Sequence, residues 1–151
     1  TAYDDCVKYK MLAGSWAAKL KSEFFIRVVE QYRGTLETAL ENSKNFNPPE
    51  SLKELIAMAK DHVSLGNITG EGWLLTAEMI SLIKNGINNI ICLRPFGCLP
   101  NHIVGKGMIR ELIHSYPQAN IVPIDCDAGA SEVNQLNRIK LMLAVAFEKI
   151  K

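Results

Sequence analysis

A cysteine held between two prolines is the feature of this sequence with the clearest chemical potential. Cys98 lies in the segment PFGCLPNH, residues 95–102, just before a stretch that we expect to be helical. The amino terminus of a helix favours the thiolate, which is the form of cysteine that binds iron or attacks an electrophile. The local pattern by itself still favours a plainer interpretation, in which Cys98 is a small apolar side chain in a turn.

Two neighbouring residues suggest further chemistry without completing a motif. His102 lies four residues after Cys98, as in a cysteine and histidine catalytic pair, but no third orienting group can be named. We therefore prefer to interpret His102 as a capping or loop-bonded histidine. Lys106 lies between two glycines, but the spacing of a phosphate-binding loop is absent. Close packing of a helix on a sheet explains these glycines better.

The elements before these residues are expected to be helical. Apolar residues at three- and four-residue steps indicate a helix over residues 5–32, ended by Gly34, and a further helix over residues 49–63. Residues 35–42 are expected to add a turn or two of helix between them. A third helix is expected from residue 73 to residue 84, stopped by the pair Asn85 and Gly86. Its inward face should carry Leu75, Met79, Leu82 and Ile83.

From residue 87 the pattern changes to strands alternating with helices. A short β-branched run at residues 87–93 predicts a strand covered on both faces, and residues 120–125 predict a second strand. Residues 101–115 are expected to form the helix between them. Ser131 is a natural N-cap for a last helix. The inward face of that helix should carry Val133, Leu136, Leu143, Phe147 and Ile150.

This order predicts an α/β fold in which a helical amino-terminal part precedes the β-α-β-α of a parallel, Rossmann- or flavodoxin-like sheet. A right-handed crossover makes the two strands parallel, so their following loops open on one edge of the sheet, where such folds bind ligands. That edge should gather Cys98, Asn101, His102, Asp125 and Asp127. Two strands make an incomplete sheet. We therefore expect a helical segment at 1–65 and a β/α half-domain at 66–151, forming one compact unit excised from a longer multidomain chain.

Composition excludes several classes of protein. The chain has 151 residues, of which 48% are hydrophobic, and its net charge of +1 comes from 17 basic and 16 acidic residues without long blocks of either sign. Nucleic acid and membrane partners are therefore not expected, and we expect a cytoplasmic protein. Four cysteines, Cys6, Cys92, Cys98 and Cys126, form no C-x-x-C pair, so a self-contained zinc site is not expected.

Several words of the sequence, in a fixed order, resemble a known family. They are VSLGN at residues 63–67, GEGWLLTAEM at 70–79, residues 95–107, and AGASEVNQLNR at 128–138. Together they resemble the carboxy-terminal region of the large CoA-substrate-specific enzyme activases, the activators of 2-hydroxyacyl-CoA dehydratases. The resemblance covers roughly residues 50 to 147.

The resemblance implies a role in electron transfer. The absent front part would be an ATPase of the actin and sugar-kinase type, and the back part is similar to dehydratase subunits that hold a 4Fe-4S cluster. Cys98 then becomes one cluster ligand, with Arg94, Asn101, His102 and Asp127 around it. Two positions depart from the family pattern, because arginine stands at 94 in place of glutamine and cysteine stands at 126 in place of an aromatic residue. Arg94 would either shift the cluster potential or pair with a carboxylate.

Three functions remain open from the sequence. The first is an iron-sulfur electron-transfer module that works with the other domains of the parent chain and with a 2-hydroxyacyl-CoA dehydratase. The second is a non-catalytic docking or scaffold domain, and the third, disfavoured by the missing phosphate loop, is a flavodoxin-like nucleotide binder. The isolated chain is expected to have no turnover. For the first function, we expect Cys98 to be accessible and Cys92 to be buried.

Overall fold

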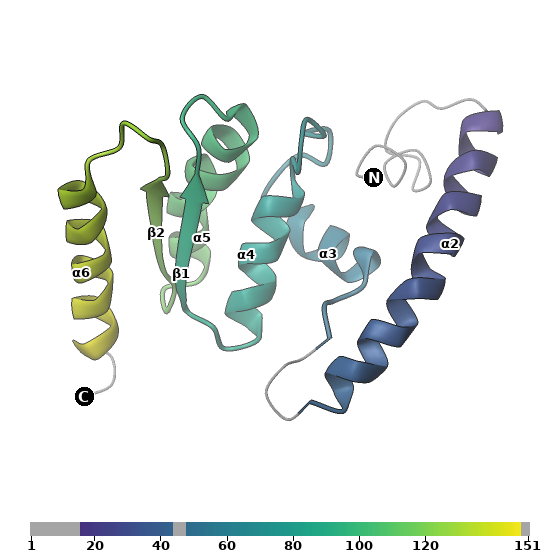
Figure 1. The fold of residues 1–151 in the computed structure, drawn as a ribbon, viewed down its shortest axis with the longest axis horizontal. Coiled ribbons are helices and arrows are strands. Elements are labelled where there is room, and N and C mark those ends of the chain that lie inside the picture. The colour runs from purple at the N-terminus through teal and green to yellow at the C-terminus, as the bar shows by residue number, and fades with distance from the viewer. Residues whose placement is uncertain (1–15, 44–47, 149–151) are drawn as a thin grey trace. The chain divides into compact units, whose positions relative to one another are not determined.

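The computed structural model describes residues 16–43 and 48–148, which belong to two compact units, Thr1–Glu54 and Leu55–Lys151. The division falls between Glu54 and Leu55, whereas the sequence suggested a change of organisation near residue 65. The second unit carries both strands and all the residues considered above as candidates for chemistry. It is shown with the first unit in Figure 1.

The described part of the first unit contains a long helix, α2 (Trp16–Glu41). This helix continues through Gly34, where we expected it to end. A glycine inside a helix costs about 1 kcal/mol relative to alanine, which side-chain contacts one turn apart can offset. Arg33 pairs with Glu37, and the Thr38 hydroxyl donates to the Gly34 carbonyl at 2.9 Å. Residues 5–15 of the predicted helix lie outside the described residues.

Helix α3 (Leu52–Ala59) begins with a reciprocal cap that the sequence analysis missed. The Glu54 carboxylate accepts hydrogen bonds from the Ser51 amide and hydroxyl, both at 2.7 Å, and the Glu54 amide lies 3.4 Å from the Ser51 hydroxyl. This is the capping box expected of a serine followed three residues later by a glutamate. The helix is shorter at both ends than the predicted span of residues 49–63.

Helix α4 (Leu74–Lys84) confirms the predicted helix, and it ends as expected at Asn85 and Gly86. The Gly86 amide donates to the Ile83 carbonyl and the Ile87 amide to the Leu82 carbonyl, at 3.0 and 2.9 Å, which is a Schellman motif. Gly86 has a φ of 83°. Leu82 is exposed, contrary to the prediction, and Ile80 is fully buried in its place.

The sheet has two parallel strands, β1 (Asn89–Arg94) and β2 (Asn120–Asp125), and β2 has the predicted bounds. Strand β1 begins two residues after and ends one residue after the predicted span of residues 87–93. The expectation that it is covered on both faces was wrong, because Ile91 and Leu93 are exposed. The register pairs Asn89 with Asn120 at one end and Arg94 with Asp125 at the other. The chain is therefore mixed α/β with a helical amino-terminal part, a small α/β fragment in which a full Rossmann fold is not present among the described residues.

The connection between the strands is an irregular helix. It begins as a π-helical turn, η1 (Asn101–Gly105), tightens to a 3-10 turn, η2 (Lys106–Met108), and continues as α5 (Ile109–Ser115). The sequence predicted one regular helix over residues 101–115. Gly105 departs from helical backbone angles, with φ −89° and ψ −88°. This glycine also lies against the sheet, because a Cβ there would be 3.5 Å from the Cys92 sulfur.

Helices lie on both faces of the strands. One face packs against α4 and α5 in a core that includes Ile80, Ile90, Leu112 and Ile121. On the other face lies α6 (Glu132–Glu148), where the Asn120 side-chain amide donates to the Met142 carbonyl at 2.9 Å. Figure 1 shows the two strands between α4 and α6.

Helix α6 is capped as predicted but turns a different side to the sheet. The Ser131 hydroxyl lies 3.4 Å from the Asn134 amide, in the N-cap position. Met142 is the buried residue of α6, whereas the expected inward residues Val133, Leu136, Leu143 and Phe147 are all exposed. Ile150, the last residue of the predicted stripe, lies outside the described residues. The apolar stripe exists, but it lies to one side of the contact with β2.

Candidate functional site

The loops that follow β1 and β2 lie at the same edge of the sheet, because the strands are parallel. Figure 1 shows both strands pointing toward these loops. The Cys126 amide donates to the Arg94 carbonyl at 2.9 Å, so the backbone hydrogen bonding between the strands continues into the loop after β2. Cys98 and Asp127 therefore lie on one edge, as the sequence predicted.

Asp127 joins the two loops directly. Its carboxylate accepts a hydrogen bond of 2.6 Å from the backbone amide of Phe96, in the turn before Cys98. Its own carbonyl accepts from the Ala130 amide at 2.9 Å, which closes the turn before α6. The Asp127 side chain thus fixes the backbone of the loop that carries Cys98. This contact could not have been predicted from the spacing of residues in the sequence.

Arg94 forms an ion pair beneath the loops. Its guanidinium Nε lies 2.7 Å from the Asp125 carboxylate, and Arg94 is only 6% exposed. Of the two roles considered for Arg94, pairing with a carboxylate is the one that the structure contains. The Nη1 atom is also buried and has no hydrogen-bond partner among the described residues. The positive charge of the buried Arg94 side chain is compensated by the negative charge of the Asp125 carboxylate.

Cys98 is half-buried in a tight turn. The turn is closed by the Cys98 amide, which donates to the Pro95 carbonyl at 3.3 Å, and Gly97 within it has a φ of 71°. After the turn, Pro100 already has helical backbone angles. The predicted loop running into a helical turn is therefore present.

Two side chains from the following turn of helix hold the cysteine. The Asn101 amide donates to the Cys98 sulfur at 3.2 Å, and Asn101 itself is buried. The His102 ring nitrogen Nδ1 lies 2.9 Å from the Cys98 carbonyl. Because a carbonyl only accepts, this bond requires a proton on Nδ1. His102 therefore acts as a loop-bonded histidine, which was the preferred interpretation, and its described contact is with the backbone of Cys98.

The other described cysteines differ from Cys98 in their surroundings. Cys92 lies within β1 and is half-buried, so the expectation that it is buried was wrong. Burial raises the pKa of the Cys92 thiol above its usual range, and the charge of Arg94 offsets part of this effect. Cys126 is exposed in the loop after β2.

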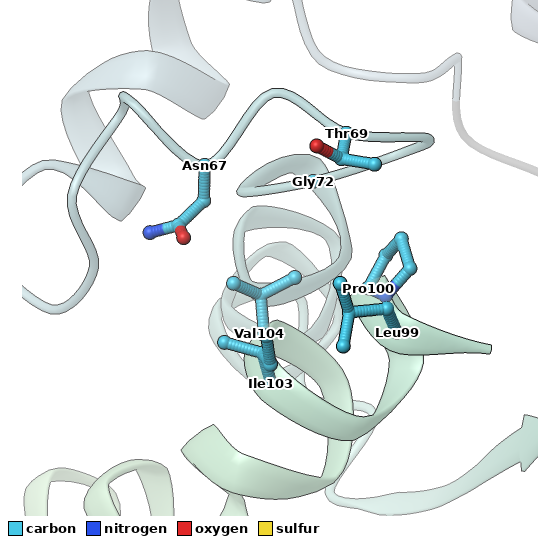
Figure 2. A pocket seen from close by; sticks show the side chains of 7 residues that line it. All are labelled: Asn67, Thr69, Gly72, Leu99, Pro100, Ile103 and Val104. Carbon is cyan, nitrogen blue, oxygen red and sulfur yellow. The ribbon is translucent and has the colours of Figure 1, made fainter. Parts of the chain in front are cut away.

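Apolar side chains surround the cysteine loop on its outer side. Phe96 is 84% exposed, and Leu99 and Ile103 are also exposed. Leu99 and Ile103, with Pro100 and Val104, form one wall of a cavity of about 60 Å³. Figure 2 shows Asn67 and Thr69 on its other side, across from this wall. Gly72 completes the loop side, where its φ of 55° and the Asn67 carbonyl 2.0 Å from an added Cβ require glycine.

The donor set falls short of a complete iron-sulfur site. Within residues 16–43 and 48–148 there is no group of three or more histidine, cysteine, aspartate or glutamate side chains that could hold a metal ion. Cys98 and Cys126 are the described thiols in the two loops at this edge, whereas a 4Fe-4S cluster is held by four cysteines. The described residues therefore do not by themselves fit the cluster that the resemblance implies.

Lys106, considered above for a phosphate contact, is exposed in η2. It lines a shallow surface hollow with Ile109, Arg110, Ile113 and Pro123.

The described helices include none with both the length and the apolar character needed to cross a membrane.

Comparisons with family models, with curated proteins and with solved structures gave no match for this chain. A function can therefore be inferred from the geometry at the edge of the sheet and from the resemblance in the sequence.

Proposed function

We propose that this chain is an iron-sulfur electron-transfer module of an ATP-dependent activator of 2-hydroxyacyl-CoA dehydratase, to which Cys98 contributes one ligand of a 4Fe-4S cluster. The observation that carries the proposal is the hydrogen bond from the buried Asn101 amide to the Cys98 sulfur, 3.2 Å long. Hydrogen bonds to a ligand sulfur help to set the potential of a bound cluster.

The remaining ligands would come from other domains of the parent chain or from a second protein. The surface around Cys98 suits such sharing, since the sulfur lies in a loop bordered by the exposed side chains of Phe96, Leu99 and Ile103. A partner that covers these side chains would exclude water from the sulfur. Asp127 and His102 would hold the loop backbone while Asn101 orients the sulfur.

The test is anaerobic reconstitution of the full-length protein that carries this chain, alone and with its dehydratase, after subtraction of the absorption of the dehydratase reconstituted by itself. The expected result is a charge-transfer absorption in the visible range that Cys98→Ala abolishes. Cys126→Ala is the matched control, because Cys126 lies at the same edge and is exposed. An absorption that survives Cys98→Ala, or is lost equally with Cys126→Ala, would contradict the proposal.

The second candidate is a docking domain without a cluster. Phe96 favours it, because an aromatic ring that is 84% exposed at the tip of a fixed loop is typical of a contact with another protein. In that case Phe96→Ala weakens binding to the dehydratase, measured by calorimetry, while Cys98→Ala leaves both binding and absorption unchanged.

A further inference from the structure

A shallow hollow lies between α5 and β2, away from the loops of the candidate site. Its apolar lining comes from Ile109 and Ile113 of α5 and from Pro123 of β2. Lys106 and Arg110 complete the lining, and the volume of the hollow is about 320 Å³. The hollow therefore combines an apolar surface with two positive charges.

The positive charges around the hollow have no acidic partner. Lys106 and Arg110 are exposed, and neither side chain forms an ion pair or a hydrogen bond with another described residue. Arg138 of α6 adds a third positive charge beside the lining residue Pro123, because its Nη1 donates to the Pro123 carbonyl at 3.2 Å. A carbonyl has no net charge, so the charge of Arg138 is not compensated by this bond.

The acidic residues that adjoin the hollow in the sequence are engaged elsewhere. Glu111 follows Arg110, but its carboxylate lies 3.7 Å from Nδ1 of His62. Asp125 ends β2, and its carboxylate lies 2.7 Å from Nε of the buried Arg94. The charge that remains at the hollow is therefore positive, and it favours a partner with negative charge.

The partner cannot be a strand that extends the sheet at β2. The Cys126 amide donates toward β1, so the odd-numbered residues of β2 turn their backbone groups outward. Pro123 has no amide hydrogen to donate. Its carbonyl already accepts from Arg138, and the Asp125 carbonyl accepts from Gln135 at 2.5 Å. Recognition at this edge must therefore use side chains.

The side chains that line the hollow repeat at the spacing of one helical turn. Ile109 and Ile113 are four residues apart, and so are Lys106 and Arg110. They form an apolar row beside a cationic row. A second helix presents matching rows when its apolar residues and its carboxylates each recur at four-residue steps. A small molecule fits less well, because small-molecule sites enclose most of their ligand and this hollow is shallow.

We propose that this hollow is a docking site for an acidic amphipathic helix of another protein. The apolar side chains of that helix pack on Ile109, Ile113 and Pro123, and its carboxylates pair with Lys106 and Arg110. Complementary charges around such a contact steer the right partner and disfavour a basic one. The inference is independent of the proposed electron transfer, because none of these residues belongs to the loops of the candidate site.

The test uses the full chain, labelled for NMR, and three synthetic helical peptides. Each peptide carries leucines at four-residue steps, and the residues beside the leucines are glutamate in the first peptide, glutamine in the second and lysine in the third. We expect the amide signals of Lys106, Ile109, Arg110 and Ile113 to shift with the glutamate peptide. Its affinity should exceed that of the glutamine peptide by about tenfold and should fall as salt is added.

Variants separate the charges from the apolar lining. Lys106→Glu with Arg110→Glu should weaken binding of the glutamate peptide by about tenfold or more and should favour the lysine peptide. Lys84→Glu with Lys140→Glu is the matched control, because it changes the net charge equally at two exposed lysines outside the hollow. Ile113→Gln should weaken all binding but keep the preference for glutamate. Circular dichroism checks that each variant is folded.

Several outcomes would overturn the proposal. One is that the glutamate peptide does not bind, or binds no better than the lysine peptide. Another is an equal loss of binding in the control pair, since general charge attraction would then explain the result. Vesicles that contain phosphatidylserine are tested in parallel, and binding to vesicles without binding to the glutamate peptide would assign the surface to a membrane. Protection of the same amides at high chain concentration, without peptide, would assign the hollow to a second copy of the chain.

Discussion

The two faces of the sheet differ in how completely they are covered. On the face of α4 and α5, Ile80 and Leu112 have no exposed surface and Ile121 has 5%. On the face of α6, Met142 is the buried residue of that helix, and Leu93 of β1 remains 60% exposed. Both faces carry apolar side chains. The comparison teaches that an apolar pattern indicates a surface that will be covered, but not which part of the molecule, or which other molecule, covers it.

The largest expected effect comes from the covered face. Leu112→Ala removes a side chain with no exposed surface and leaves a cavity, so we expect the free energy of unfolding to fall by about 2–5 kcal/mol. Leu141→Ala on the other side of the sheet should change it by less than about 0.5 kcal/mol, because Leu141 is exposed. Urea denaturation followed by circular dichroism measures both. Equal losses in the two variants would show that the faces do not differ.

These faces also mark how far the sequence could predict the fold. Short apolar runs predicted the two strands, and an apolar stripe with the Asn85 and Gly86 stop predicted α4, because local periodicity and turn chemistry decide such elements. The side of α6 that meets the sheet was predicted wrongly. Its stripe at Leu136 and Leu143 is the more apolar side, but contact is made through Met142 and through polar bonds from Arg138 and Gln135.

The candidate site was predictable as a location but not as a set of contacts. Parallel strands place their loops on one edge, so Cys98 and Asp127 could be brought together from topology. The bonds from Asn101 to the Cys98 sulfur and from Phe96 to Asp127 depend on loop geometry that spacing does not determine. The ion pair of Arg94 with Asp125 could have been predicted from the sequence, because the two residues end adjacent parallel strands in register. The capping box at Ser51 could have been found from its S-x-x-E spacing alone.

A smaller loss of stability than that of Leu112→Ala is expected at the ion pair between Arg94 and Asp125, where the covered face adjoins the candidate site. Asp125→Asn keeps the shape of the side chain but removes the charge that compensates the buried Arg94 guanidinium. Asp125 is partly exposed, which screens the pair, so we expect a loss of about 1–3 kcal/mol in the free energy of unfolding. Thermal and urea unfolding measure it. The double variant Arg94→Leu with Asp125→Asn should recover part of the loss, and a double variant less stable than Asp125→Asn would contradict this account.

The N-cap of α6 tests the less covered face. Ser131→Ala removes the hydroxyl that caps the first turn, and we expect a loss of about 0.5–1 kcal/mol. Ser131→Asp, which retains a capping oxygen, is the control and should be close to the original stability. If Ser131→Ala costs as much as Leu112→Ala, α6 is as firmly held as the core helices, and the contrast between the faces fails.

The smallest effect is a shift in the pH dependence of one thiol on the covered face. Burial raises the pKa of Cys92, so its thiolate should appear only at higher pH than that of an ordinary cysteine, and alkylation should follow. The measurement is the alkylation rate against pH in a variant whose other cysteines are changed to serine, with a short cysteine peptide as reference. The raised pKa also affects the stability of the fold. A thiol that holds its proton more tightly in the folded chain stabilises the fold at pH values below the ordinary thiol pKa, and this stabilisation is lost as the pH rises through the raised pKa.

Two variants control the measurement of Cys92 alkylation. Ile90→Ala opens the face beside Cys92 and should move the alkylation profile toward the reference peptide, whereas Leu141→Ala should leave it in place. A profile for Cys92 that coincides with the peptide would show that the covered face does not protect this thiol.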